Sequence, residues 1–172
     1  ATAFLAGYLY KSAHFLQWGW YKFIGSTYRN ILFSPVQESS KVGGLLGLFL
    51  PFVFLIALIF LLPFLAELEE KIFRKGKHSW GAIVPSAVAW GFSHLVVGVP
   101  LSVGVALIVP GLFYGFKYRR DFYRNIRLGT SLDDAVDKAT FLVTTYHTLS
   151  NTVVIGGLSI RLVAVALGLT GG

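Results

Sequence analysis

The sequence contains no cysteine and no methionine, and only 13% of its 172 residues are charged. The lack of cysteine excludes disulfide bonds, thiolate metal sites and cysteine nucleophiles. Soluble domains carry about 25% charged residues, whereas this chain is 55% hydrophobic and 16% aromatic, with a mean hydropathy of +0.66. This composition excludes a disordered chain and predicts an integral membrane protein. Because no initiator methionine is present, we expect the native N-terminus to lie outside this sequence.

Several motifs of soluble enzymes are also missing. The chain has no His-Glu-x-x-His motif of zinc proteases, no phosphate-binding glycine loop and no Gly-x-Ser-x-Gly turn of serine hydrolases. Lys and Arg outnumber Asp and Glu by 15 to 8, which gives a net charge of +7. In a soluble protein this excess would indicate nucleic-acid binding. In a membrane protein it is typical of basic loops on one face of the bilayer, so we expect a lipid partner and no nucleic acid.

Three stretches without charged residues are long enough to cross a membrane. They cover residues 42–66, 78–116 and 139–160, and about 20 apolar residues span the hydrocarbon core. A single helix over 78–116 would measure about 58 Å, roughly twice the core thickness. Proline stops a helix and disfavours helical geometry in the residue before it. We therefore expect two helices, separated at Gly98-Val99-Pro100.

Basic residues cluster in two segments that flank the divided stretch. If 78–116 forms a helical hairpin, segments 67–77 and 117–138 lie on the same side of the membrane. The positive-inside rule names this side as cytoplasmic, or stromal in a plastid. The basic residues are Lys71, Arg74, Lys75 and Lys77 in the first segment, and Lys117, Arg119, Arg120, Arg124, Arg127 and Lys138 in the second.

The N-terminal stretch 4–24 is rich in Tyr and Trp but is interrupted by basic residues. This composition suits the headgroup region, so we expect an interfacial helix. A capped helix start is predicted at Thr130 and Ser131, which are followed by Asp133, Asp134 and Asp137. The predicted fold class is all-α: a polytopic membrane helix bundle with about four spanning helices, the interfacial N-terminal helix and a short C-terminal helix. We divide the chain into an aromatic-rich interfacial segment and connector, 1–41, and a helical domain, 42–172.

Two adjacent carboxylates lie where the first apolar stretch ends. Ionisable side chains in membrane helices are costly and usually mark function. The i, i+4 spacing allows Glu70 to pair with Arg74, and Glu69, about 100° further round the helix, is then free to face elsewhere. The structural alternative is an exposed or ion-paired helix end. We expect Glu70 to be structural and Glu69 to be chemically available.

Two histidines and an asparagine also fall inside predicted spans. His94 lies in the second span, while His147 and Asn151 share one face of the last. Packing or hydrogen bonding between helices is the structural alternative. We favour a shared site, because packing alone does not explain so many polar groups in so apolar a chain. Along ideal helices His94 lies about 21 Å from its helix start and Glu69 about 12 Å from the loop. The two meet only if the helices tilt or start at different depths.

Three motifs therefore occur in order on the predicted helices: Glu-Glu-x-x-x-Arg at 69–74, Trp-x-x-x-His at 90–94 and His-x-x-x-Asn at 147–151. They resemble the motifs of the CAAX prenyl protease and bacteriocin-processing (CPBP, Abi) family of intramembrane proteases. Trp90 stands where that family has phenylalanine. The resemblance covers about residues 45–169.

The resemblance implies an intramembrane endopeptidase that acts on a membrane-anchored peptide or protein. Glu69 would polarise a water molecule for attack on the peptide carbonyl, and His94 would hold that water. His147 and Asn151 would donate hydrogen bonds to the developing oxyanion. The implied supporting residues are Glu70, Arg74 and Trp90.

The resemblance leaves the cofactor and the activity open. We favour no metal and no other cofactor, although Glu69, His94 and His147 are residue types that bind Zn²⁺. The alternative function is that of a non-catalytic family member, which serves as a scaffold, assembly factor or subunit of a larger membrane complex, including a photosynthetic one. A small transporter or channel comes third, because no charged pathway runs through the predicted spans.

Overall fold

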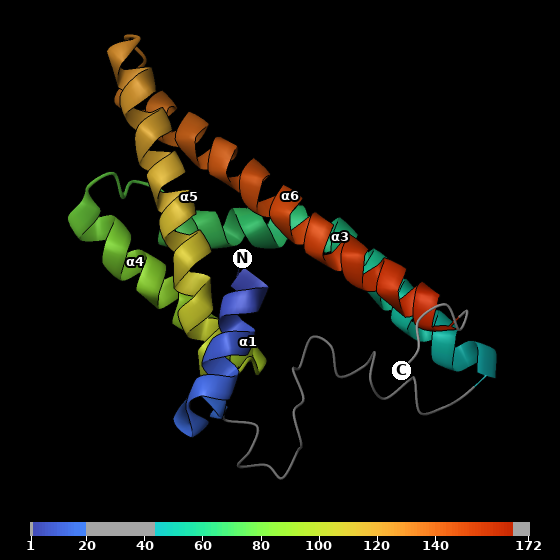
Figure 1. The fold of residues 1–172 in the computed structure, drawn as a ribbon. Helices are drawn as coiled ribbons and strands as arrows, with labels where there is room; N and C mark the ends of the chain where they lie inside the picture. The colour runs from blue at the N-terminus through green and yellow to red at the C-terminus, as the bar shows by residue number, and fades with distance from the viewer. Residues whose placement is uncertain (1, 20–43, 167–172) are drawn as a thin grey trace.

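The computed structural model describes residues 2–19 and 44–166, and every regular element in these ranges is a helix (Figure 1). The all-α prediction is therefore confirmed for this part of the chain. The elements are α1 (Thr2–Ser12), the short 3-10 helix η1 (His14–Gln17), α3 (Gly44–Phe73), α4 (Trp80–Ser93), the 3-10 helix η3 (His94–Val97), α5 (Leu101–Arg127) and α6 (Leu132–Ala166).

Three helical segments among the described residues are long and apolar enough to cross a membrane. They are Phe52–Phe73 in α3, Trp80–Val97 in α4 and η3, and Leu101–Arg127 in α5. The predicted fourth window, 139–160, lies inside α6, and its crossing stays a prediction. Because α6 runs without a break to Ala166, the expected separate C-terminal helix does not begin before that residue. Residues 167–172 lie outside the described part.

The long uncharged stretch is divided where the sequence predicted. Ser79 caps α4, with its hydroxyl accepting a hydrogen bond from the backbone N–H of Ala82. After η3 the chain turns at Gly98, whose φ of 84° favours glycine. Pro100 then precedes the first residue of α5, a position where its missing N–H does no harm. The hairpin of two helices at residues 98–100 is confirmed.

Glycines bring α4 and α5 into close contact. A Cβ atom added to Gly91 would lie 2.6 Å from the carbonyl oxygen of Gly104, and one added to Gly111 would lie 2.9 Å from the ring of Trp90. Small residues allow membrane helices to approach closely without a hydrophobic driving force. This approach presses the indole of Trp90 against α5.

Helix α6 packs on both α5 and α3, and so connects two parts of the bundle. Ser131 caps its first turn by accepting a hydrogen bond from the N–H of Asp134, as predicted. One buried cluster joins α6 to α5 and another joins it to α3. The clusters contain Tyr118, Phe122, Ala135, Ala139 and Val143, and Leu55, Leu58, Leu62 and Ile155, respectively. The crossing of α3 and α6 places Glu70 beside His147, although 77 residues separate them.

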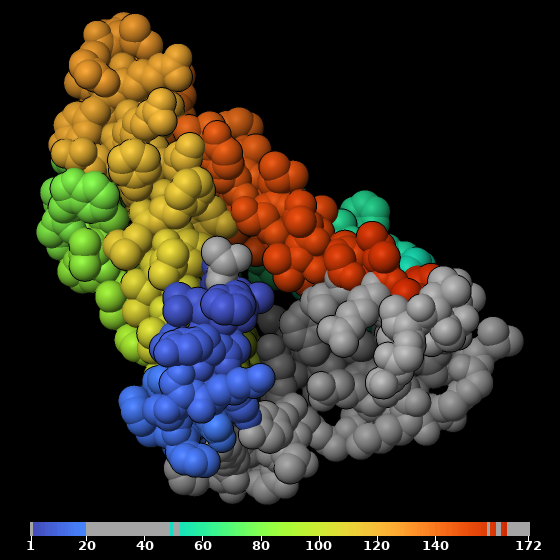
Figure 2. All heavy atoms as spheres, viewed as in Figure 1, coloured from blue at the N-terminus to red at the C-terminus, as the bar shows by residue number. Residues whose placement is uncertain are grey.

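The N-terminal helix lies against α5, as Figure 2 shows. The backbone N–H of Leu101 donates a hydrogen bond of 2.9 Å to the carbonyl of Trp18, which fixes the first turn of α5 to the end of the N-terminal segment. The position of α1 at a membrane interface stays a prediction. The remainder of the stretch 4–24 and the connector to residue 41 lie outside the described part.

Candidate active site

The two glutamates at the end of α3 have different surroundings. The side chain of Glu70 is fully buried, whereas that of Glu69 is 32% exposed. The predicted pair of Glu70 and Arg74 is present, with 3.4 Å between Oε1 and Nη1, and the Arg74 side chain is only 3% exposed. Of the two carboxylates, only Glu69 is therefore accessible to a reactant.

His147 from α6 lies between the two carboxylates. Its Nδ1 is 2.8 Å from Oε1 of Glu70, and its Nε2 is 3.9 Å from Oε2 of Glu69. An ionised carboxylate can only accept hydrogen bonds, so Nδ1 carries the hydrogen when Glu70 is ionised. The sequence predicted that Glu70 serves only to pair with Arg74. Instead it fixes both the tautomer and the orientation of His147, because its helix crosses α6 at this level.

Trp90 from α4 contacts Glu69 directly. Its indole Nε1–H donates a hydrogen bond of 2.5 Å to Oε2 of Glu69, the same oxygen that faces His147. The guanidinium of Arg74 lies 4.5 Å from the centroid of the Trp90 ring, within the range of a cation–π interaction. Phenylalanine could pack at this position but could not donate to the carboxylate, so the hydrogen bond is a property of tryptophan.

His94 lies one turn beyond Trp90, at the end of α4. Its Nδ1 donates to the backbone carbonyl of Trp90 at 2.8 Å, and the two rings meet edge to face with centroids 4.9 Å apart. Helices α3 and α4 thus contact each other at the level of Trp90, one turn before His94. This agrees with the sequence analysis, in which His94 lies further from the loop between the two helices than Glu69 does. Trp90 therefore makes the direct contact with Glu69, and His94 joins the cluster through Trp90.

Asn151 lies one turn after His147 on α6 and is partly buried. The structure gives it no hydrogen bond to any other described residue. The motifs thus bring Glu69, Glu70, Arg74, Trp90 and His147 into one cluster, with His94 at its edge and Asn151 beside it.

Tyr114 is a residue of this cluster that the sequence analysis missed. Its ring stacks on His147 with centroids 5.0 Å apart and an angle of 26° between planes, and the residue is buried. Together with Trp90 it encloses the imidazole between two aromatic rings. The sequence does contain a pattern that could have identified it. Tyr114 and Tyr118 lie four residues apart, on the face of α5 that also carries Gly111 and packs against the other helices.

Some buried polar atoms of the cluster form no hydrogen bond, although Nη1 of Arg74 makes an ion pair with Glu70. Oε2 of Glu70 and the Nη atoms of Arg74 are shielded from solvent and have no hydrogen-bond partner among the described residues. Such atoms destabilise a fold, and charged groups of this kind are typical of functional sites. The described residues include no group of three His, Asp or Glu side chains placed to hold a metal ion. Glu69, His94 and His147 therefore do not form a ready ligand set.

The loop after α3 holds the glutamates in place. Gly76, with a φ of 78°, donates its N–H to the hydroxyl of Tyr118 at 2.8 Å. Lys77 donates to the carbonyl of Ile72, and burial, followed by the nearby charge of Arg74, lowers its pKa. Ser86 of α4 hydrogen-bonds the Phe73 carbonyl. The end of α3 is thus tied to both α4 and α5.

No protein-family model matches the chain, and comparisons with curated proteins and with solved structures give no match either.

Proposed function

We propose that this protein is an intramembrane endopeptidase of the CAAX protease/Abi type, in which Glu69 activates a water molecule that attacks a peptide bond. The observation that carries this proposal is the placement of an accessible Glu69 carboxylate 3.9 Å from His147 on another helix, with a buried Glu70–Arg74 pair behind them. A general base requires an accessible carboxylate close to a hydrogen-bonding partner.

Each side chain then has a distinct role in the proposed reaction. Glu69 takes the proton of the water, and His94, whose Nδ1 is held by a backbone carbonyl, presents its other nitrogen to that water. As the imidazolium, His147 keeps its Nδ1–H on Glu70 and donates its Nε2–H to the oxyanion that forms on the peptide carbonyl. Asn151 donates to the same oxyanion. Glu70, itself paired with Arg74, holds His147 in place. In this mechanism the carboxylate of Glu69 reacts and that of Glu70 supports the site. The mechanism as proposed uses no metal and no other cofactor.

The decisive experiment compares Glu69→Gln with wild type on cleavage of membrane-anchored peptides. Glutamine keeps the size of the side chain and still accepts from Trp90, but it cannot take a proton. We expect cleavage to be abolished while thermal stability stays close to that of wild type. A chelator in the wild-type assay should leave the rate unchanged. If Glu69→Gln cleaves the peptides at the wild-type rate, the mechanism is wrong.

One specific observation favours the alternative, a non-catalytic scaffold, assembly factor or subunit of a larger membrane complex. The oxygen of Glu69 that faces His147 already accepts the hydrogen bond of Trp90, which occupies one of its lone pairs. If wild type cleaves no membrane peptide but co-purifies stoichiometrically with a larger complex, this alternative replaces the enzyme. A pigment-containing complex would show itself in the absorption spectrum of the purified sample.

We further propose that segments 67–77 and 117–138 lie on the cytoplasmic or stromal side. The ion pair of Lys75 with Asp137 and the hydrogen bond of Gly76 with Tyr118 support a common side, because each joins the two segments. The chain lacks cysteine, so single cysteines at Lys75 and Arg120 report accessibility cleanly. Both should react equally with an impermeant thiol reagent in sealed vesicles, and opposite reactivity would contradict the topology.

A further inference from the structure

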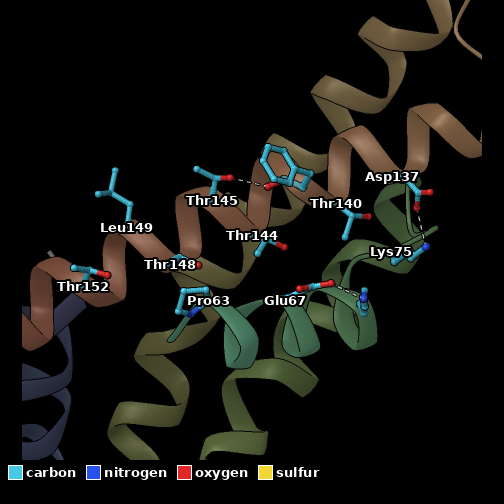
Figure 3. Close-up of a pocket in the computed structure, with 12 residues that line it drawn as sticks. Pro63, Glu67, Lys75, Asp137, Thr140, Thr144, Thr145, Thr148, Leu149 and Thr152 are labelled. Atoms are coloured by element: carbon cyan, nitrogen blue, oxygen red, sulfur yellow. Dashed lines mark hydrogen bonds and ion pairs between the residues drawn. The ribbon is translucent and has the colours of Figure 1, made fainter. Parts of the chain in front are cut away.

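A groove of about 770 Å³ runs between α3 and α6, outside the candidate active site (Figure 3). Neither Glu69, His94 nor Trp90 lines it. Its volume is within the range of small-molecule sites, about 300–1,000 Å³. The lining residues are Pro63, Glu67, Lys71 and Lys75 on one side, and Asp137, Thr140, Phe141, Thr144, Thr145, Thr148, Leu149 and Thr152 on the other.

Hydroxyl groups follow one another along the α6 wall of this groove. Thr140, Thr144, Thr148 and Thr152 recur every fourth residue, and Figure 3 shows Thr140 and Thr144 pointing from α6 towards α3. The hydroxyl of Thr140 donates to the carbonyl of Val136 at 2.8 Å. The hydroxyl oxygen of Thr144 is buried and has no hydrogen-bond partner among the described residues. This hydroxyl is an unpartnered donor in the wall of the groove, about halfway along it, and rotation about the Cα–Cβ bond of Thr144 would turn it towards a ligand.

The mouth of the groove carries two positive and two negative side chains. Lys71 pairs with Glu67 at 2.5 Å, and Lys75 pairs with Asp137 at 2.8 Å. These side chains are between 43% and 67% exposed, so each ion pair can open to a polar ligand with little loss of energy. The four charges sum to zero, which matches a ligand group that itself carries one charge of each sign.

The groove runs from this charged mouth into the membrane-spanning part of α3. Lys75 lies beyond the apolar segment Phe52–Phe73, whereas Pro63 lies in its middle. At 1.5 Å per residue the two are separated by about 18 Å. The groove therefore offers charges at one end, a hydroxyl below them and an apolar surface from Pro63 and Leu149 further down. A lipid in one leaflet presents its groups in the same order, with a charged headgroup, then polar ester groups and then apolar acyl chains.

We propose that this groove binds one zwitterionic glycerophospholipid. Its phosphate contacts Lys71 and Lys75, its amine contacts Glu67 and Asp137, and an ester carbonyl accepts from the hydroxyl of Thr144. An acyl chain then follows the groove past Pro63. An anionic lipid would satisfy only the lysines and leave the carboxylates without a new partner. This proposal does not depend on the protease activity proposed above.

The test is native mass spectrometry of the full chain after extraction from bilayers that contain equal amounts of phosphatidylethanolamine and phosphatidylglycerol. We expect one phosphatidylethanolamine to be retained per protein. Thr144→Val removes one hydrogen bond without changing the shape of the side chain, and should reduce retention about five- to tenfold. Lys71→Gln with Lys75→Gln should reduce it further. Lys138→Gln, a neighbouring exposed cation that does not line the groove, is the matched control and should behave as wild type.

Several outcomes would overturn the lipid site. These are equal retention of phosphatidylglycerol, no retained lipid in wild type, or full retention by Thr144→Val. Equal losses from the double variant Lys71→Gln with Lys75→Gln and from Lys138→Gln would also overturn it, because they would indicate ordinary annular contact. Thermal unfolding of each variant verifies that it is folded. Thr148→Trp fills the groove and should displace the lipid. If it stops peptide cleavage and leaves lipid retention unchanged, the groove binds peptide and not lipid.

Discussion

The contact between α3 and α6 carries charged pairs on two sides, and the two sets differ chiefly in burial. In the active-site cluster, Glu70 pairs with Arg74 four residues later and with His147 of α6, and these side chains are 0–3% exposed. At the groove mouth, Glu67 pairs with Lys71 four residues later, while Lys75 pairs with Asp137 of α6. The Glu67 and Lys71 side chains are about half exposed. The i, i+4 spacing therefore occurs in both sets, once in a buried ion pair of low dielectric and once in an exposed pair that water screens.

This difference determines what each set can do. Buried charges interact strongly but must be fully paired, since removal of one partner leaves the other without solvation. Exposed pairs contribute little to stability and exchange partners easily. A buried set is therefore suited to hold a reactive histidine in one orientation, and an exposed set is suited to receive a ligand from the membrane surface. Sequence spacing alone does not separate these two cases.

The largest expected effect comes from Glu70→Gln, which breaks the buried set. Arg74 and His147 both lose their carboxylate, and Arg74 is left buried without a counter-charge. Removal of one member of a buried pair typically costs about 3–5 kcal/mol, so we expect a large loss of folded protein. The measurement is the yield and the thermal unfolding midpoint in detergent. Glu69→Gln is the matched control, because Glu69 is partly exposed and its hydrogen bond to Trp90 persists.

Trp90→Phe should have an intermediate effect. It removes the N–H donor to Glu69 but retains an aromatic ring against Arg74. A hydrogen bond to a charged group contributes about 1.5–3 kcal/mol. A double-mutant cycle with Glu69→Leu, which removes the acceptor, isolates this contribution from the lost ring volume. If the two substitutions are additive, the indole hydrogen bond adds no stability, and Trp90 acts only through packing.

The smallest effect is expected for Glu67→Gln at the groove mouth. An exposed i, i+4 pair on a helix contributes about 0.3–0.5 kcal/mol, and salt screens it. Unfolding midpoints at low and high salt should therefore differ slightly in wild type and by less in the variant, which keeps the exposed pair of Lys75 and Asp137. An effect as large as that of Glu70→Gln would show that burial is not what separates the two sets.

Much of the fold was predictable from the sequence because local rules decide it. Pro100 and Gly98 divide the long uncharged stretch, and Ser79 and Ser131 cap the helices that follow them. These outcomes depend on backbone geometry within a few residues. The i, i+4 spacing likewise predicted the pair of Glu70 and Arg74.

Only the tertiary structure decided which motif residues touch. Three helices must cross at particular levels before Trp90, and not His94, donates to Glu69, and before Glu70 bonds His147. The level of α4 relative to α5 depends on close packing at Gly91 and Gly111, and that of α6 relative to α3 on the cluster of Leu55, Leu58, Leu62 and Ile155. Sequence spacing fixes directions along one helix but not the relative heights of two helices, which depend on how their side chains interdigitate. The sequence by itself therefore determined which residues are polar within the membrane helices, and the packing of α3, α4 and α6 decided which of them share a hydrogen bond.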